Sequence, residues 1–162
     1  MSKVDVQFIE QRAFVLAMVQ FTSRSDLSVV ETPRVIGFDM LVRIATEKDE
    51  DQVLFGVKLL GTNQTLSGPE EAAKHLMRRP IGKHGKPLPR YTFPVIVLLF
   101  SMRDDRGYFA WRLEPGFDER DGPKLKSRDE MVCSVFDRAS LGEIVDKVSG
   151  WHERLFVMLG EV

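Results

Sequence analysis

An uninterrupted apolar run from Phe93 to Phe100 constrains the fold most strongly. Three of its residues are valine or isoleucine, which favour strands, and it lacks the polar alternation of a strand with one face in water. The run is also far too short to cross a bilayer as a helix. It therefore predicts a central strand that is buried on both faces of a sheet.

Helical and strand-like patterns precede this run. Apolar residues at helical spacing predict a helix over about Asp5–Phe21, with Glu10 falling within its apolar stripe. A second helix is expected to start near Ser67 with a capping box and to end at Pro80. Between the helices, alternating or continuous apolar residues predict three strands, at Leu27–Glu31, Ile36–Ala45 and Val53–Leu60.

The C-terminal part is expected to add a strand partner and a long helix. Tyr108–Leu113 follows a turn and is predicted to pair antiparallel with the apolar run, whereas Pro115–Ser127 is polar and expected to be irregular. Met131–Phe136 is a candidate last strand. A capping box from Ser140 to Glu143 is predicted to start the final helix. Its apolar stripe includes Trp151, which like Trp111 is expected in a core or interface, and His152 is expected to face solvent.

Length and composition indicate one globular domain over residues 1–162, with a core at about 5–114 and a last strand and helix at about 128–160. The 162 residues are 43% hydrophobic and 29% charged, and the net charge of −1 restricts any nucleic-acid surface to a local patch. The single cysteine, Cys133, lies among apolar residues, which excludes a disulfide within the chain and predicts an inert thiol. With no secretory signal pattern at the start, we expect a cytoplasmic protein without a membrane segment.

The predicted order, helix, three strands, helix, strand, resembles the core of the PD-(D/E)XK, or restriction-endonuclease-like, superfamily. Several short strings also resemble a bacterial family of domains of unknown function placed near it. The resemblance covers roughly Phe8–Glu114 and implies a mixed α/β fold, an αβββαβ core with an added hairpin or strand and a long helix. The strings are Gly37-Phe38-Asp39, the segment Phe55–Thr62, the segment Phe93–Val97 and the segment Tyr108–Trp111.

In such nucleases a metal ion lies between an Asp of the second strand and a Glu or Gln of the third, with a Lys two residues further on and often a Glu of the first helix. The resemblance maps Glu10 and Asp39 onto the helix and strand acids. It places Lys58 at the Glu or Gln position and Leu60 at the Lys position. Losing one such electrostatic group typically costs about 10²–10³ in rate. An impaired active site is therefore expected, with Mg²⁺ or Mn²⁺ held by Asp39 and Glu10 only if activity survives.

The hairpin between the second and third strands permits a geometric prediction. A turn centred on Lys48 and Asp49 places Asp39 opposite Lys58, so that the two form an ion pair where a metal would otherwise lie. A ligand-binding polar pocket and surviving metal chemistry remain alternatives for Asp39, and Lys58 is also a candidate displaced catalytic lysine. Glu10 is either a paired structural carboxylate or a metal ligand.

A basic cluster begins within the second predicted helix and continues into the loop after it, and the chain has no acidic residue between Ala72 and Arg90. Such a patch binds phosphates in a salt-dependent and sequence-independent way. The alternative is a solvated helix end and loop. The cluster consists of Lys74, Arg78, Arg79, Lys83, Lys86 and Arg90.

Three functional hypotheses follow from these features. The first is a catalytically impaired nuclease-fold protein that binds DNA, RNA or a partner. The second is a protein-interaction module of a bacterial defence, toxin or mobile-element system, which functions as a homodimer or with another protein. The third is a divergent metal-dependent nuclease that uses Lys58 in place of the lost lysine.

Overall fold

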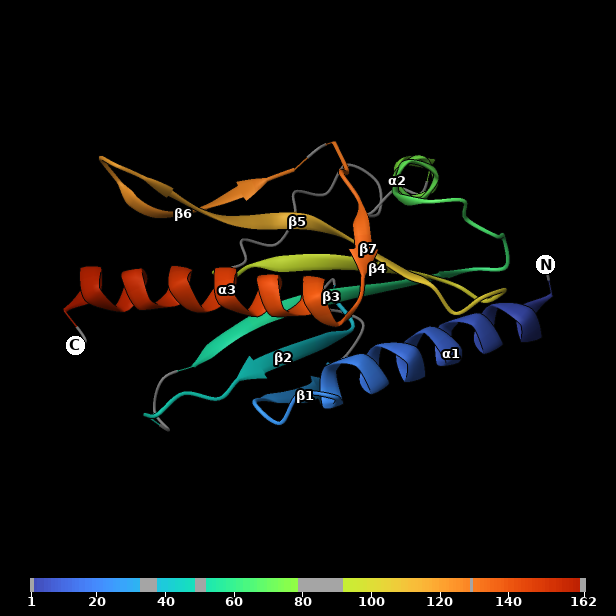
Figure 1. Cartoon of the computed structure of the whole chain (residues 1–162), viewed down its shortest axis with the longest axis horizontal. Coiled ribbons are helices and arrows are strands. Elements are labelled where there is room, and N and C mark those ends of the chain that lie inside the picture. Colours follow the sequence, from blue (N-terminus) through green and yellow to red (C-terminus); the bar gives the residue numbers. More distant parts are fainter. Residues whose placement is uncertain (1, 33–37, 49–51, 79–91, 129, 161–162) are drawn as a thin grey trace.

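The computed structural model describes residues 2–32, 38–48, 52–78, 92–128 and 130–160. These residues form three helices and a mixed sheet of seven strands (Figure 1). In chain order the elements are α1 (Lys3–Thr22), β1 (Leu27–Glu31), β2 (Met40–Ile44), β3 (Val53–Thr62), α2 (Pro69–Arg78), β4 (Val95–Ser101), β5 (Gly107–Asp118), β6 (Gly122–Ser127), β7 (Ser134–Phe136) and α3 (Arg138–Leu159).

The strands lie side by side in the order β1-β2-β3-β4-β5-β6, and β7 pairs with another part of β5. Strands β3 and β4 are parallel, and α2 connects them as a crossover. The remaining neighbours are antiparallel. The predicted mixed α/β class and the order of the first elements are thus confirmed.

Apolar side chains form a core on each face of the sheet. On one face, α1 and α3 pack through residues such as Ala17 and Val148 against the sheet residues Phe55 and Leu98. Figure 1 shows these two helices as long ribbons along the sheet, with α2 viewed end-on. On the other face, α2 packs through residues such as Leu76 against a smaller cluster. The short helix α2 covers only part of this face, and residues such as Ser28 and Arg43 remain exposed.

The central strands agree with their sequence patterns. Every residue of β4 is buried, as its continuous apolar run predicts. On β2 the alternation is confirmed for Met40, Val42 and Ile44, which are buried, and Phe38 just before the strand is buried too. Ile36 lies outside the described residues. None of the helices in the described part of the chain combines the length and apolarity needed to cross a bilayer.

The prediction of an irregular segment from Pro115 to Ser127 is wrong. Strand β5 continues to Asp118, and β6 returns beside it as a hairpin. Gly122, in the turn, has a φ of 77°, which glycine adopts without steric cost. The hairpin is largely exposed, so its sequence lacks the buried alternation that reveals a strand. The expected strand over Met131–Phe136 is also shorter, since pairing begins only at Ser134.

The capping contacts of two helices differ from those predicted, although α2 starts close to Ser67 as expected. Helix α3 is capped by Asp137, whose side chain accepts a hydrogen bond from the Ser140 backbone N–H, while the Ser140 side chain contacts the Asp137 backbone N–H. The capping box therefore lies three residues before the predicted one. At α2, Glu71 rather than Glu70 reaches back and accepts from the backbone N–H of Ser67 at 2.6 Å.

His152 is buried, with 5% of its surface exposed, which overturns its predicted exposure. Pairing of β3 with β4 begins at Gly56, so the backbone of Leu54 lies beyond the end of β4. The Nε2 atom of His152 lies 3.0 Å from the Leu54 carbonyl oxygen and 3.4 Å from its nitrogen. With its hydrogen on Nε2, the imidazole donates to the Leu54 carbonyl, which the neighbouring strand leaves uncovered.

This burial predicts a pH-dependent stability. Burial lowers the pKa of His152, and the hydrogen bond to Leu54 only partly opposes that shift. Below the ordinary value of 6.5 the unfolded chain takes up a proton that the folded chain excludes. Stability should therefore be level above about pH 7 and fall as the pH drops below about 6.5. Urea denaturation across this range should show a shallower fall for His152→Gln, and an equal fall would contradict the assignment.

Candidate functional site

An open cleft lies between α1 and the ends of β1, β2 and β3, with a volume of about 620 Å³. Its polar lining includes the acids Glu10 and Asp39 and the ammonium group of Lys58. Thr32, Gln7 and Gln11 also line it. The structure thus brings all three residues of the predicted catalytic set to one cleft.

The position of Asp39 follows from the way β2 and β3 separate. The backbone N–H of Asp39 donates to the Val57 carbonyl at 2.8 Å. This is the last backbone hydrogen bond between the two strands at this end. Beyond it, the Asp39 carboxylate accepts from the backbone N–H of Leu59 at 2.7 Å. The side chain therefore takes the place of the missing strand partner and is fixed at the floor of the cleft.

Lys58 forms the predicted ion pair with this carboxylate. Met40 and Val57 are the last opposed pair of the two strands, and Asp39 and Lys58 directly adjoin them, with the Asp39 backbone still bonded to Val57. The Nζ atom is 3.2 Å from Oδ2 and 3.4 Å from Oδ1 of Asp39. With 19% of the Asp39 side chain and 32% of the Lys58 side chain exposed, the pair is partly desolvated yet still open to the cleft.

Glu10 occupies the opposite wall of the cleft. Its side chain is exposed, so the expectation that it lies in the buried stripe of α1 is wrong. The buried side of α1 is instead formed by Ile9, Ala13, Ala17 and Phe21. Because Glu10 follows Ile9 directly, it projects beside the helix–sheet contact and into the cleft.

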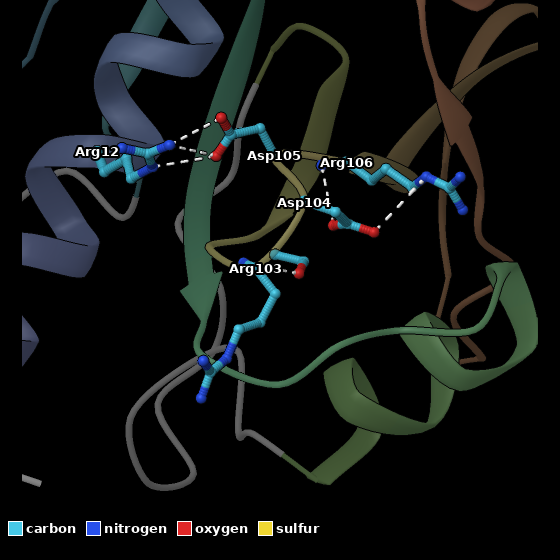
Figure 2. A network of polar contacts seen from close by, with 6 residues as sticks. Arg12, Arg103, Asp104, Asp105 and Arg106 are labelled. Atoms are coloured by element: carbon cyan, nitrogen blue, oxygen red, sulfur yellow. Dashed lines mark hydrogen bonds and ion pairs between the residues drawn. The ribbon is translucent and has the colours of Figure 1, made fainter.

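A bidentate ion pair holds α1 on the side of the β4–β5 turn (Figure 2). Arg12 donates from Nε and Nη2 to the Asp105 carboxylate, at 3.0 and 2.7 Å. Asp105 has a φ of 58°, a left-handed conformation that aspartate tolerates better than most residues. In the same turn Arg103 donates to the carbonyl of Asn63 at 2.9 Å. The Arg12–Asp105 pair thus connects α1 to the β4–β5 turn, and the Arg103 contact connects that turn to the end of β3.

Gly56 and Gly61, which the sequence did not single out, shape β3 around the site. A Cβ atom at Gly61 would lie 2.4 Å from Ile9 Cγ2, so only glycine lets α1 pass this closely. At Gly56 a Cβ atom would meet Phe93 at 3.2 Å, Val95 at 3.3 Å and Phe38 at 3.5 Å. The aromatic rings of Phe38 and Phe93, in edge-to-face contact, thus cover Gly56.

The residues of the cleft do not fit a divalent cation well. Mg²⁺ and Mn²⁺ prefer several carboxylate or carbonyl oxygens. Here the Asp39 carboxylate is already bound by an ammonium group and a backbone N–H, and Glu10 is the other acid in the lining. Among the described residues, no group of three or more His, Cys, Asp or Glu side chains is arranged to hold a metal ion.

The described part of the basic cluster lies on α2. Lys74 and Arg78 are exposed and line a pocket of about 330 Å³ together with Glu70 and Glu71. Hydrogen bonds from Ser67 lower the pKa of Glu71, and the charges of Lys74 and Arg78 add to the effect. The acids lie one helical turn before Lys74 and two turns before Arg78, contrary to the expectation of an unopposed cluster. Arg79, Lys83, Lys86 and Arg90 lie outside the described residues.

Cys133 and Trp151 have the structural roles predicted for them. Burial raises the pKa of the Cys133 thiol to about 11, so the reactive thiolate is scarce at neutral pH. Trp151 is buried, and its Nε1–H donates to the carbonyl of Lys124 on β6 at 3.0 Å. Neither residue belongs to the cleft.

Comparisons with protein families, with curated proteins and with solved structures found no match to this chain.

Proposed function

We propose that this protein is a nuclease-like domain that binds nucleic acid through the exposed cations of α2 without cutting it. The observation that carries the proposal is the ion pair in the cleft, where Lys58 Nζ lies 3.2 Å from the Asp39 carboxylate. In the family that the sequence resembles, this is the region of the metal ion. An ammonium group that is already paired with a carboxylate takes the place of the metal ion but cannot activate water as a metal does.

Both ways of aligning the third strand with the nuclease pattern support impairment. If Lys58 stands at the acidic position, Leu60 replaces the lysine and the charge stabiliser is lost. If Lys58 is itself the lysine, the acidic position two residues earlier is Gly56, whose surroundings are filled by aromatic rings. In either alignment a metal ligand is missing from β3.

Affinity for nucleic acid would come from phosphate contacts. Lys74 and Arg78 supply exposed cations on α2, whereas the charge of Lys58 is already balanced by Asp39. Contacts of this kind release counterions, so affinity should fall steeply as the salt concentration rises. Contacts to phosphates do not distinguish one base from another, so nucleic acids of different base sequence should bind about equally well.

The test is fluorescence anisotropy with labelled double-stranded DNA, single-stranded DNA and single-stranded RNA. Wild-type protein should bind at least one of them and lose affinity between about 50 and 200 mM salt. Lys74→Glu/Arg78→Glu should weaken binding by about tenfold or more, because each lost phosphate contact also becomes a repulsion. A matched double variant with the same change of charge is Lys126→Glu/Arg138→Glu, on β6 and α3, where both residues are exposed.

The control variant should retain most of the affinity. Equal loss in the two double variants would show that net charge, rather than α2, determines binding. Binding that neither variant alters would reject α2 as the contact surface.

A second candidate function is a protein-interaction module. It is favoured by an exposed apolar row along the outer side of α1, formed by Val4, Phe8, Val15 and Val19, each more than half exposed. A surface helix is ordinarily polar on that side. Failure of all three nucleic-acid probes to bind would favour this candidate over the first.

A further inference from the structure

The two outer strands of the sheet differ in how their free edges are protected. Strand β6 carries Pro123, which has no backbone N–H, and the charged residues Lys124 and Lys126. The Lys124 carbonyl also accepts a hydrogen bond from the Trp151 indole at 3.0 Å. Proline, lysine and a covering helix are the devices by which proteins prevent unwanted pairing at a sheet edge. Strand β6 is thus protected.

Strand β1 has none of these devices. Its sequence, Leu27-Ser28-Val29-Val30-Glu31, contains no proline or lysine, and among the described residues no strand pairs with its outer side. Ser28 is exposed, and Val30 is 54% exposed. An edge strand of this composition is a template for another strand.

The direction of the backbone groups on β1 follows from its pairing with β2. The Ala45 N–H donates to the Asp26 carbonyl at 2.8 Å, and antiparallel register alternates from that pair. Ser28 and Val30 therefore direct their backbone groups toward β2. Val29 and Glu31 direct theirs to the free edge, together with the carbonyl of Leu27, whose N–H donates to Arg24.

We propose that β1 pairs antiparallel with β1 of a second copy of this chain, around a two-fold axis at Val29. In this register Val29 exchanges backbone hydrogen bonds with Val29 of the second copy, and the Glu31 N–H donates to the Leu27 carbonyl. Ser28 lies opposite Val30. All five residues of β1 are paired in this register, whereas a shift in either direction leaves outward groups without partners.

The side chains suit such a self-pairing. Val29 is partly buried against the core under α1, so two copies of Val29 would join the two cores across the axis. On the other side of the sheet the uncharged residues Ser28 and Val30 come opposite each other, so no like charges face each other at these positions.

The same register would bring the second copy close to the cleft. Thr32, which lines the cleft, follows β1 directly and would lie opposite Asp26 of the second copy. Asp26 is held by Arg24 of its own chain at 2.7 Å. Each copy would then supply this ion pair beside the cleft of the other. Self-pairing itself does not depend on the proposed nucleic-acid binding.

The test is sedimentation velocity over about a hundredfold range of protein concentration, with two variants that differ at one position. In Ser28→Glu/Val30→Glu, acids face each other twice across the axis, whereas in Ser28→Glu/Val30→Lys, opposite charges face each other. The new carboxylate at position 28 lies opposite Arg43 of β2 within its own chain in both variants. The first variant should self-associate about tenfold more weakly than the second.

A wild-type protein that stays monomeric over the whole range would overturn the proposal. Equal self-association of the two variants, at any strength, would contradict the register and place an interface elsewhere, such as the outer side of α1. Amide exchange of wild-type protein provides an independent measurement if a variant fails to fold. Protection of the Val29 amide should rise with protein concentration, and protection that does not change would count against the pairing.

Discussion

Lys58→Glu is expected to convert the cleft into a site that binds Mn²⁺. The substitution replaces the ammonium group beside Asp39 with a second carboxylate, so that two acids share a partly desolvated position. Without metal the variant should lose about 1–3 kcal/mol of stability from this repulsion. Mn²⁺ at about a hundred times its dissociation constant should restore about 2.7 kcal/mol, a rise in melting temperature of about 5–10 °C.

Lys58→Met separates the effect of the new carboxylate from the loss of the lysine. It removes the same cation and retains an unbranched side chain, yet supplies no oxygen ligand. Thermal denaturation of this variant and of wild-type protein should therefore change little with Mn²⁺. An equal rise in all three proteins would mean that Mn²⁺ binds elsewhere, and no rise for Lys58→Glu would mean that the position does not suit a metal.

Gly61→Ala should destabilise the fold by about 2–4 kcal/mol. Its Cβ atom would lie 2.4 Å from Ile9 Cγ2 and 3.2 Å from the Ile9 carbonyl oxygen, so α1 must move away from β3. Ile9 is buried, and its β-branched side chain has few alternative rotamers in a helix. The same displacement should move Glu10 relative to Asp39. Urea denaturation gives the change in the free energy of unfolding.

Gly116→Ala is the matched control on β5. No atom lies within 4 Å of the position where its Cβ would be placed, and its φ is not positive. Alanine there should be neutral or stabilise by about 0.5 kcal/mol, because it restricts the unfolded chain. Similar losses at Gly61 and Gly116 would contradict the argument that close approach of α1 sets the cost.

The sequence predicted those parts of the fold in which burial determines the pattern. The run from Phe93 to Phe100 and the alternation before Ile44 each report a buried surface, and the structure confirms both strands. The β5–β6 hairpin is largely exposed, so its residues carry no such signal. His152 was misjudged because its burial depends on an uncovered backbone at Leu54, which is 98 residues away in the chain.

The features of the candidate site likewise divide into those that the sequence predicts and those that it does not. The ion pair of Asp39 and Lys58 was predictable because a short hairpin fixes the register of its strands, and the structure confirms that register from Met40 to Ile44. The contact of Gly61 with Ile9 and the aromatic cover over Gly56 were not, because they join residues from separate elements. By contrast, the proximity of Glu70 and Glu71 to Lys74 follows from their spacing on the predicted helix.

The central claim is that the Lys58 ammonium group holds Asp39 where a nuclease would hold a metal ion. Calorimetric titration of Mn²⁺ into wild-type protein and into Asp39→Asn tests it most directly, with labelled DNA and RNA incubated in parallel. We predict equally weak Mn²⁺ uptake by both proteins and intact nucleic acid throughout. Saturable Mn²⁺ binding by wild-type protein that Asp39→Asn abolishes, together with cleavage that is lost in the same variant, would contradict the claim.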